Sequence, residues 1–466
     1  MNTRKSPRCA GWMWIVAFVC ITPTLLAQDA ATSTDDVQTL VKQLNDANPI
    51  NRYAAARSLF QLGEAAKPAV PSLIEHLDDS DEPTRAACVE ALAEIGPVEK
   101  EIVPALVKKL DDKSAFVCHT AAVSLGRFGA AAKPAVPELI KVFERSDAER
   151  QAVIARTFGE IGPVAKESRD VLTSALDAKT PEVQVAAALG LAQVDPSAKV
   201  AVDKLATLLT NSEIVIRSSA ADALAVLGEQ AAGSAKALAS ATQDDSPRVR
   251  RQAVRALGRI GEGARDELQV LTARTTDDDE YVRQVAVLAI ARVAPRSPET
   301  ADALAKSLSD ANAQVRENAA IAFRTLDQNL QPHVPALVAA LATSDTDVVD
   351  AIAETLTKVS ETSLAELKKA AEDDSSDQRR GTAIALGRLI DHDPNVRKSA
   401  LPVLVELLTD EDWQVRRAAA RGLGTAGKHA VSALPELTAA MRERNKFVRR
   451  AAAAAIQSIS EDEPLD

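Results

Sequence analysis

The sequence predicts an all-α fold, an α-solenoid of about thirteen two-helix repeats with a period of about 33 residues. Three observations favour this class. Alanine-rich segments end at regular intervals, their apolar residues recur at helical spacing, and aromatic residues make up only 3% of a chain that is 46% hydrophobic. Small apolar side chains suit close helix packing, whereas a sheet favours β-branched and aromatic residues.

The first 27 residues differ from the rest of the chain. Three basic residues among the first eight precede an apolar run, Gly11–Ile21, and Ala27 is a suitable last residue before a cleavage site. A membrane span needs about 20 apolar residues, so this shorter run predicts an export signal, with an uncleaved anchor as the alternative. We expect a short linker at residues 28–34 and a periplasmic or extracellular protein, without membrane insertion after cleavage.

The repeats follow over residues 35–460. The first ten units close at evenly spaced positions, Gly63, Gly96, Gly129, Gly162, Asp195, Gly228, Gly261, Ala294, Asp327 and Ser360. The next three closing positions are Ile390, Gly427 and Ser460, where one shorter and one longer interval give a register slip near residues 376–400. We expect the polar segment Ile390–Ala400 to form a longer connection there. Residues 461–466 form an acidic tail.

Each unit has the pattern of a helical hairpin. A first segment such as VPELIKVFE carries apolar residues at helical spacing after an early proline, and an Asp-rich turn follows it. The second segment of the seventh unit places Val249, Ala253, Leu257 and Ile260 on one face of a helix. Glycine closes seven of the thirteen units, where a left-handed residue can end the helix. The narrow apolar face can be buried only by neighbouring repeats.

The pattern D-x5-R-x2-A-x2-A-L-x2-I-G, complete from Asp244 to Gly261, resembles the HEAT repeats. The short bacterial HEAT-like type first associated with bilin lyases is the most similar. The resemblance extends from Asp35 to Ser460, while the TPLH signature of ankyrin repeats and the Trp/Tyr pattern of tetratricopeptide repeats are absent. It implies a fold rather than an activity, because this repeat type serves many functions.

In HEAT repeats a ladder of side chains joins the turn to the second helix, and the resemblance implies the same here. An arginine stands eleven residues before the closing position in nine units: Arg52, Arg85, Arg217, Arg250, Arg283, Arg316, Arg379, Arg416 and Arg449. Six residues earlier, seven of these units carry an aspartate: Asp46, Asp79, Asp244, Asp277, Asp310, Asp373 and Asp410. We expect each arginine to bond its own turn or the next one along.

No motif in the sequence predicts catalysis, a cofactor or a metal. The segment GLGTAGKH, Gly422–His429, matches a phosphate-binding loop, but its glycines close a helix instead of opening one. The five histidines lie in distant units and none precedes a glutamate, unlike the His-Glu pairs of the HEAT-type deoxyhypusine hydroxylases. Cys88 is expected in the core, and the sequence leaves a disulfide between Cys88 and Cys118 as an alternative to two free thiols.

Charge argues against a nucleic-acid partner. Residues 28–375 carry 38 Lys and Arg against 53 Asp and Glu, whereas residues 376–466 carry 14 against 13. A phosphate-binding domain should be predominantly basic. The C-terminal part is basic only when its acidic tail is left out, and the export signal argues against a nucleic-acid partner. A protein partner is favoured, with an anionic polysaccharide as a further option.

The exposed face of the second helices, on the inner surface of the solenoid, is where we expect a partner to bind. The position next to each ladder arginine changes along the chain from small residues to arginines, and neighbouring positions add further arginines. The candidate partner-binding residues are Arg251, Arg255, Arg259, Arg380, Arg417, Arg421 and Arg450.

The sequence therefore predicts a non-catalytic binding scaffold in the cell envelope or outside the cell. The alternative is a lyase-like enzyme or an enzyme accessory factor.

Overall fold

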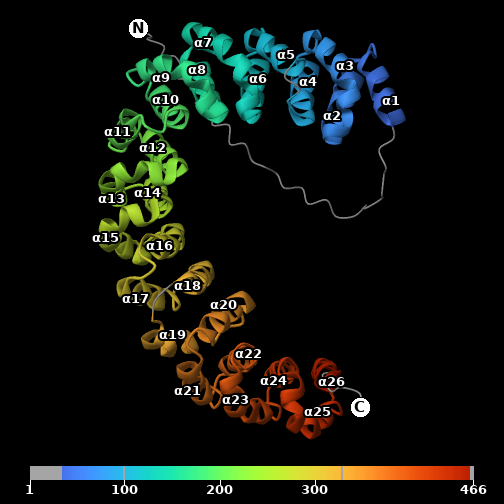
Figure 1. Cartoon of the computed structure of the whole chain (residues 1–466), viewed down its shortest axis with the longest axis vertical. Coiled ribbons are helices and arrows are strands. Elements are labelled where there is room, and N and C mark those ends of the chain that lie inside the picture. Colours follow the sequence, from blue (N-terminus) through green and yellow to red (C-terminus); the bar gives the residue numbers. More distant parts are fainter. Residues whose placement is uncertain (1–33, 98–99, 327–328, 462–466) are drawn as a thin grey trace, which may run out of the picture. The chain divides into compact units, whose positions relative to one another are not determined.

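The computed structural model describes residues 34–97, 100–326 and 329–461. In these residues the chain forms α-helices and short 3₁₀ segments, with no strand, so the predicted all-α class is confirmed. Helices α1 to α26 alternate between the first and the second helix of a pair, which gives thirteen pairs in the described residues (Figure 1). The pairs divide into two compact units, one up to Ile95 and one from Gly96 onward.

The first unit holds two helical pairs. Its helices are α1 (Thr34–Leu44), α2 (Pro49–Leu62), α3 (Val70–Glu75) and α4 (Glu82–Ile95). Asn48 caps α2 by accepting a hydrogen bond from the backbone N–H of Ile50, and a proline opens the helix. The second helices α2 and α4 pack against each other.

The second unit holds the remaining eleven pairs. Its first helices are α5 (Ile102–Lys108), α7 (Val136–Arg145), α9 (Arg169–Ala175), α11 (Lys199–Leu208), α13 (Ala235–Ala241), α15 (Leu268–Ala273), α17 (Pro298–Ser307), α19 (Val334–Ala339), α21 (Ser360–Ala370), α23 (Pro394–Leu407) and α25 (Leu434–Ala440). Its second helices are α6 (Ala115–Arg127), α8 (Ala148–Ile161), α10 (Pro181–Val194), α12 (Ile214–Leu227), α14 (Pro247–Ile260), α16 (Glu280–Val293), α18 (Ala313–Thr325), α20 (Thr346–Thr357), α22 (Ser376–His392), α24 (Trp413–Thr425) and α26 (Lys446–Glu461).

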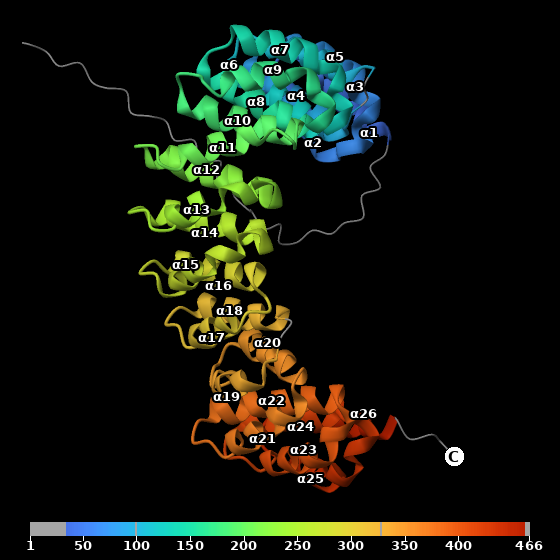
Figure 2. The same ribbon diagram turned by 60° about the vertical axis from the view of Figure 1, so that its left-hand side comes forward.

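Within the second unit each second helix packs against the second helix of the next pair, from α6 through to α26. First and second helices therefore form two layers, which Figure 2 shows clearly for α11 to α18. The predicted stripe of α14, with Val249, Ala253, Leu257 and Ile260, is buried between the layers. Burial of such stripes between repeats is what holds a solenoid together.

Small residues let neighbouring second helices approach closely. A Cβ added to Gly258 of α14 would lie 2.9 Å from the Cβ of Ala289 on α16. A Cβ on Gly387 of α22 would lie 2.8 Å from the Cα of Gly422 on α24. Both distances are shorter than non-bonded carbon contacts allow, so the abundance of small residues follows from the packing of this layer.

The glycines that close the units have positive φ. These are Gly63, Gly96, Gly129, Gly162, Gly228, Gly261 and Gly427. The conformation differs from the left-handed helical one that we expected, because Gly261 has φ 67° and ψ −137°. That region is open essentially to glycine alone. It turns the chain from α14 directly into the 3₁₀ segment η7 (Gly261–Glu267), which leads to α15.

The register slip does not produce the longer polar connection that we expected at Ile390–Ala400. Instead α22 extends to His392 and α23 begins at Pro394, so that one residue, Asp393, separates them. The Asp393 side chain accepts a hydrogen bond from the backbone N–H of Asn395 and caps α23. The extra residues are absorbed into longer helices, because helical residues satisfy their own backbone groups and a polar loop must find partners.

Candidate functional site

The ladder arginines hold two consecutive turns at once. In the seventh repeat, Arg250 Nη1 donates to the carbonyl oxygens of Asp244 (3.1 Å) and Asp245 (3.3 Å) in its own turn. Its Nε and Nη2 donate to the carboxylate of Asp277 in the next turn, at 3.0 and 2.7 Å. We expected each arginine to bond either its own turn or the next one, and Arg250 makes both sets of hydrogen bonds at once. A planar guanidinium has five donors and can serve both groups.

The same arrangement recurs along both units. Complete rungs join Arg52 to Asp79, Arg217 to Asp244, Arg250 to Asp277, Arg283 to Asp310, Arg379 to Asp410, and Arg416 to Glu443. Arg85, Arg316 and Arg449 bond the carbonyl oxygens of their own turns. The ladder aspartates also fix the turns, because each accepts a backbone N–H two residues on; Asp46 does so from Asn48 and Asp373 from Ser375.

Three of the four units without the arginine show what replaces it. Cys118 Sγ donates to the carbonyl oxygen of Asp112 at 3.0 Å, and Gln184 Nε2 donates to that of Ala178 at 2.6 Å. Both acceptors lie six residues earlier, as the acceptor of Arg250 does. Gln151 instead bonds the carbonyl of Phe143, because α7 continues to Arg145 and shortens the turn that follows.

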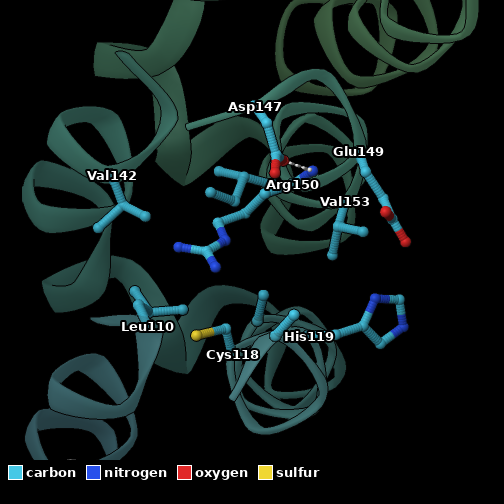
Figure 3. Close-up of a pocket in the computed structure, with 11 residues that line it drawn as sticks. Leu110, Cys118, His119, Val142, Asp147, Glu149, Arg150 and Val153 are labelled. Carbon is cyan, nitrogen blue, oxygen red and sulfur yellow. Dashed lines mark hydrogen bonds between the residues drawn. The ribbon is translucent and has the colours of Figure 1, made fainter. Parts of the chain in front are cut away.

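The short Cys118 side chain leaves a cavity of about 50 Å³ between α6 and α8. Leu110 and Val142 line this cavity, and the side chain of Arg150 points into it (Figure 3). Burial raises the pKa of the Cys118 thiol and raises that of Cys88 to about 12. Cys88 and Cys118 are both free and buried thiols. Neither cysteine has the features of a reactive thiol.

A larger groove, of about 660 Å³, crosses α20, α22 and α24. We call it the arginine groove, defined by Arg380 and Arg388 of α22 and Arg417 and Arg421 of α24. Arg380 and Arg388 are eight residues apart, and Arg417 and Arg421 are four apart, so each pair lies on one face of its helix. Gly387 and Gly422 also line the groove, at the point where their missing side chains let α22 and α24 approach closely.

Two of the four arginines are already paired. Arg388 lies 3.6 Å from Asp350, and Arg380 lies 3.2 Å from Asp377. Arg380 also donates to the carbonyl oxygen of Thr343, and only 14% of its side chain is exposed. Arg380 is therefore held by the protein itself and is less available to a partner than its sequence position implied.

The other two arginines repel each other. Burial lowers the pKa of Arg417, and the positive charge of Arg421 lowers it further. No carboxylate among the described residues forms an ion pair with either side chain. A pair of like charges in a groove, without a counter-ion, is an arrangement that an anionic ligand would stabilise.

The remaining candidate arginines lie outside this groove. Arg255 of α14 pairs with Asp222 at 3.2 Å, and Arg251 lies over the ring of Tyr281 at 6.0 Å. Arg259 of α14 and Arg450 of α26 are exposed. Sequence reasoning missed Arg388, although its spacing of eight residues from Arg380 already placed the two on one helix face.

The described residues contain no group of three or more His, Cys, Asp or Glu side chains placed to hold a metal ion. No helix in the described part of the chain is both long and apolar enough to cross a lipid bilayer.

Comparison with known proteins supports the repeat assignment. The family model described as HEAT repeats matches residues 25–93, 70–155, 136–225, 202–291, 301–387 and 401–466. No curated protein matches the chain in sequence. The karyopherin Kap121p bound to the SUMO protease Ulp1p superposes with a TM-score of 0.56 at 15% identity, over 91% of this chain and 56% of that one. Kap121p bound to Nup53p superposes with a TM-score of 0.54 at 16% identity, over 93% of this chain and 57% of that one.

The chain thus spans little more than half the length of the karyopherin chains, and identity this low shows a shared fold alone. The family model, by contrast, matches most of the chain. Its matches and the thirteen helical pairs together show that the chain belongs to the HEAT-repeat family.

Proposed function

We propose that this protein is a non-catalytic scaffold that binds an acidic segment of another protein through the exposed face of its second helices. The arginine groove is the main contact. The observation that carries the proposal is the pair Arg417 and Arg421, two neighbouring guanidinium groups without a carboxylate partner in the described residues. A bidentate carboxylate would relieve their repulsion and satisfy their donors.

The solved structures that share the fold support a polypeptide partner. In them, Kap121p is bound to the protease Ulp1p, to Nup53p, or to the extreme C-terminus of the phosphatase Cdc14p. A stack of helical pairs offers an extended surface on which successive repeats can each contribute side chains to one bound chain. The same property is available to the layer of second helices here.

We further propose that the protein acts in the cell envelope or outside the cell. The basic start of the chain and the apolar run Gly11–Ile21, which lie outside the described residues, have the pattern of an export signal. Sequencing the N-terminus of the protein recovered from an envelope fraction should give a chain that begins at Gln28. Recovery of the intact N-terminus from the cytoplasm would contradict the proposal.

The binding proposal is tested by affinity capture from envelope extract, with the captured protein identified by mass spectrometry. A variant with Arg417→Glu, Arg421→Glu and Arg450→Glu, which we call the groove variant although Arg450 lies beside the groove, should lose at least nine-tenths of the captured partner, since each change replaces attraction to carboxylates by repulsion. Arg380 is left unchanged because it holds the turn at Thr343.

The control makes the same change in net charge elsewhere. Lys133, Lys166 and Arg265 are exposed in the 3₁₀ segments that precede first helices, and their replacement by Glu should leave capture unchanged. Equal capture by the groove variant and the parent protein would exclude the arginine groove as the binding site.

A further inference from the structure

An aromatic pair lies beside the arginine groove, at the N-terminal ends of α24 and α26. The rings of Trp413 and Phe447 stack, with centroids 5.5 Å apart and an interplanar angle of 26°. Phe447 is 41% exposed. Arg417 lies over its ring at 5.7 Å and Lys446 at 5.1 Å. Arg417 therefore contacts the aromatic pair and also lines the groove.

The repeat itself does not require an aromatic residue at this position. The residue at this position is polar in the two preceding repeats, Gln414 and Asp377, but aromatic and exposed in two earlier ones, Phe116 and Tyr281. Phe447 is therefore not a core residue of the unit, and the exposed part of its side chain is available to an apolar group. Burying an aromatic face removes a large apolar area from water and strengthens nearby cation–π contacts by excluding solvent.

We propose that the arginine groove and the aromatic pair together bind a short peptide segment with two adjacent acidic residues next to an aromatic residue. The carboxylates pair with Arg417 and Arg421, and the aromatic side chain packs on the exposed part of Phe447. This inference rests on the proposed function and specifies the chemistry of the partner.

The charges around the groove favour such a short motif over a uniformly charged polymer. Arg380 and Arg388 are paired with Asp377 and Asp350, and Asp391 also lines the groove. A polymer with a negative charge at every unit would meet these carboxylates as well as the arginines. A segment with two carboxylates and an apolar neighbour meets the two unpaired arginines and the exposed ring only.

The position of Trp413 provides a direct measurement. The chain has three tryptophans, and the other two, Trp12 and Trp14, lie in the N-terminal segment. In the full chain carrying Trp12→Phe and Trp14→Phe, fluorescence therefore reports on Trp413 alone. The probe is a blocked heptapeptide with the sequence Gly-Ser-Asp-Glu-Phe-Gly-Ser, compared with versions containing Asn-Gln-Phe or Asp-Glu-Ala.

The Asp-Glu-Phe peptide should change the Trp413 emission and bind at least tenfold more tightly than either comparison peptide, since charged hydrogen bonds and a buried ring each contribute a tenfold factor or more. Arg421→Gln should weaken its binding at least tenfold. Phe447→Ala should remove the preference for Asp-Glu-Phe over Asp-Glu-Ala and leave the preference over Asn-Gln-Phe. Arg265→Gln, outside the groove, should change nothing.

Equal binding of Asp-Glu-Phe and Asn-Gln-Phe would overturn the inference. So would a preference for phenylalanine that survives Phe447→Ala, or binding of polygalacturonate that is tighter than that of the peptide and independent of Phe447. These results would leave the proposed scaffold function standing as long as the groove variant still fails in capture. Undiminished capture by that variant would defeat both proposals together.

Discussion

The guanidinium of a ladder arginine joins two repeats because its donors point in two directions. One edge of Arg250 reaches the carbonyl groups of its own turn, and the other reaches Asp277 in the next turn. The hydrogen bond with Asp277 raises the pKa of Arg250, and burial opposes this only in part. Backbone carbonyls that would otherwise lack partners are satisfied at the same time.

The glycines that close the repeat units also act at the scale of single residues, through their backbone conformation. At Gly261, φ is 67° and ψ is −137°, a conformation that a residue with a Cβ adopts only under strain. Gly233, in the 3₁₀ segment η6 (Gly228–Ser234), is not among the glycines of positive φ, and a Cβ there would meet no atom within 4 Å. The two glycines form a matched pair, since only the first needs its conformational freedom.

We therefore expect Gly261→Ala to destabilise the protein by about 1–3 kcal/mol. Gly233→Ala should be neutral or stabilise it by up to about 1 kcal/mol, because alanine restricts the unfolded chain. Urea unfolding followed by circular dichroism measures both. If the two substitutions changed the free energy of unfolding equally, the conformation at position 261 would not disfavour a residue with a Cβ.

At the scale of the elements, the ladder is interrupted between α18 and α22. Arg316 bonds the carbonyl groups of its own turn, but the equivalent acidic position in the next turn is Thr343, which supplies no carboxylate. The Thr343 hydroxyl accepts the backbone N–H of Asp345 and so keeps the shape of the turn. The next arginine position is occupied by Val349, so two successive repeats lack the pairing.

Thr343→Asp should restore the rung to Arg316 and raise the free energy of unfolding by about 1 kcal/mol. Thr343→Asn is the matched control, because it keeps an acceptor for the turn and adds no charge. Thermal unfolding of the two variants gives the comparison. An aspartate variant no more stable than the asparagine variant would argue against the carboxylate as the stabilising part of the rung.

At the scale of the whole molecule, the repeated arginine–carboxylate rungs make the stability of the folded protein depend on pH. The hydrogen bond from Arg217 lowers the pKa of Asp244 below its ordinary value of 3.8. At Asp79, Asp277, Asp310 and Asp410 burial raises the pKa, but the bonds from their arginines and from backbone N–H groups, together with the arginine charges, lower it more, so the net shift is downward. A carboxyl group with a depressed pKa contributes stability above its unfolded pKa and loses it as pH falls through its folded pKa.

The thermal midpoint should therefore stay nearly constant above about pH 5 and fall steeply below about pH 4. Calorimetric scans between these values measure the drop. In Asp244→Asn the midpoint should be lower at neutral pH and the acid-induced drop smaller, since one titrating rung is gone. An unchanged drop in this variant would mean that other carboxyl groups control the acid response.

Much of the fold could be predicted because the signals are local. The stripe of Val249, Ala253, Leu257 and Ile260 has a counterpart in the other repeats, and helical periodicity depends only on neighbours along the chain. The register slip could not be interpreted in this way. The polar residues around Asp393 read as a loop, yet they cap and begin a helix, because their hydrogen bonds depend on local geometry that composition does not reveal.

The sequence by itself therefore determined the repeat, the two helices of each unit, and the positions of the ladder residues, since all of these follow from a short pattern repeated many times. Only the tertiary structure decided which arginines are available to a partner. Arg380 and Arg417 hold equivalent positions, but Arg380 is held by Thr343 and Asp377, whereas Arg417 faces Arg421 and Phe447. The difference depends largely on side chains and backbone groups from neighbouring repeats, which are distant in the chain and come together only when the repeats stack.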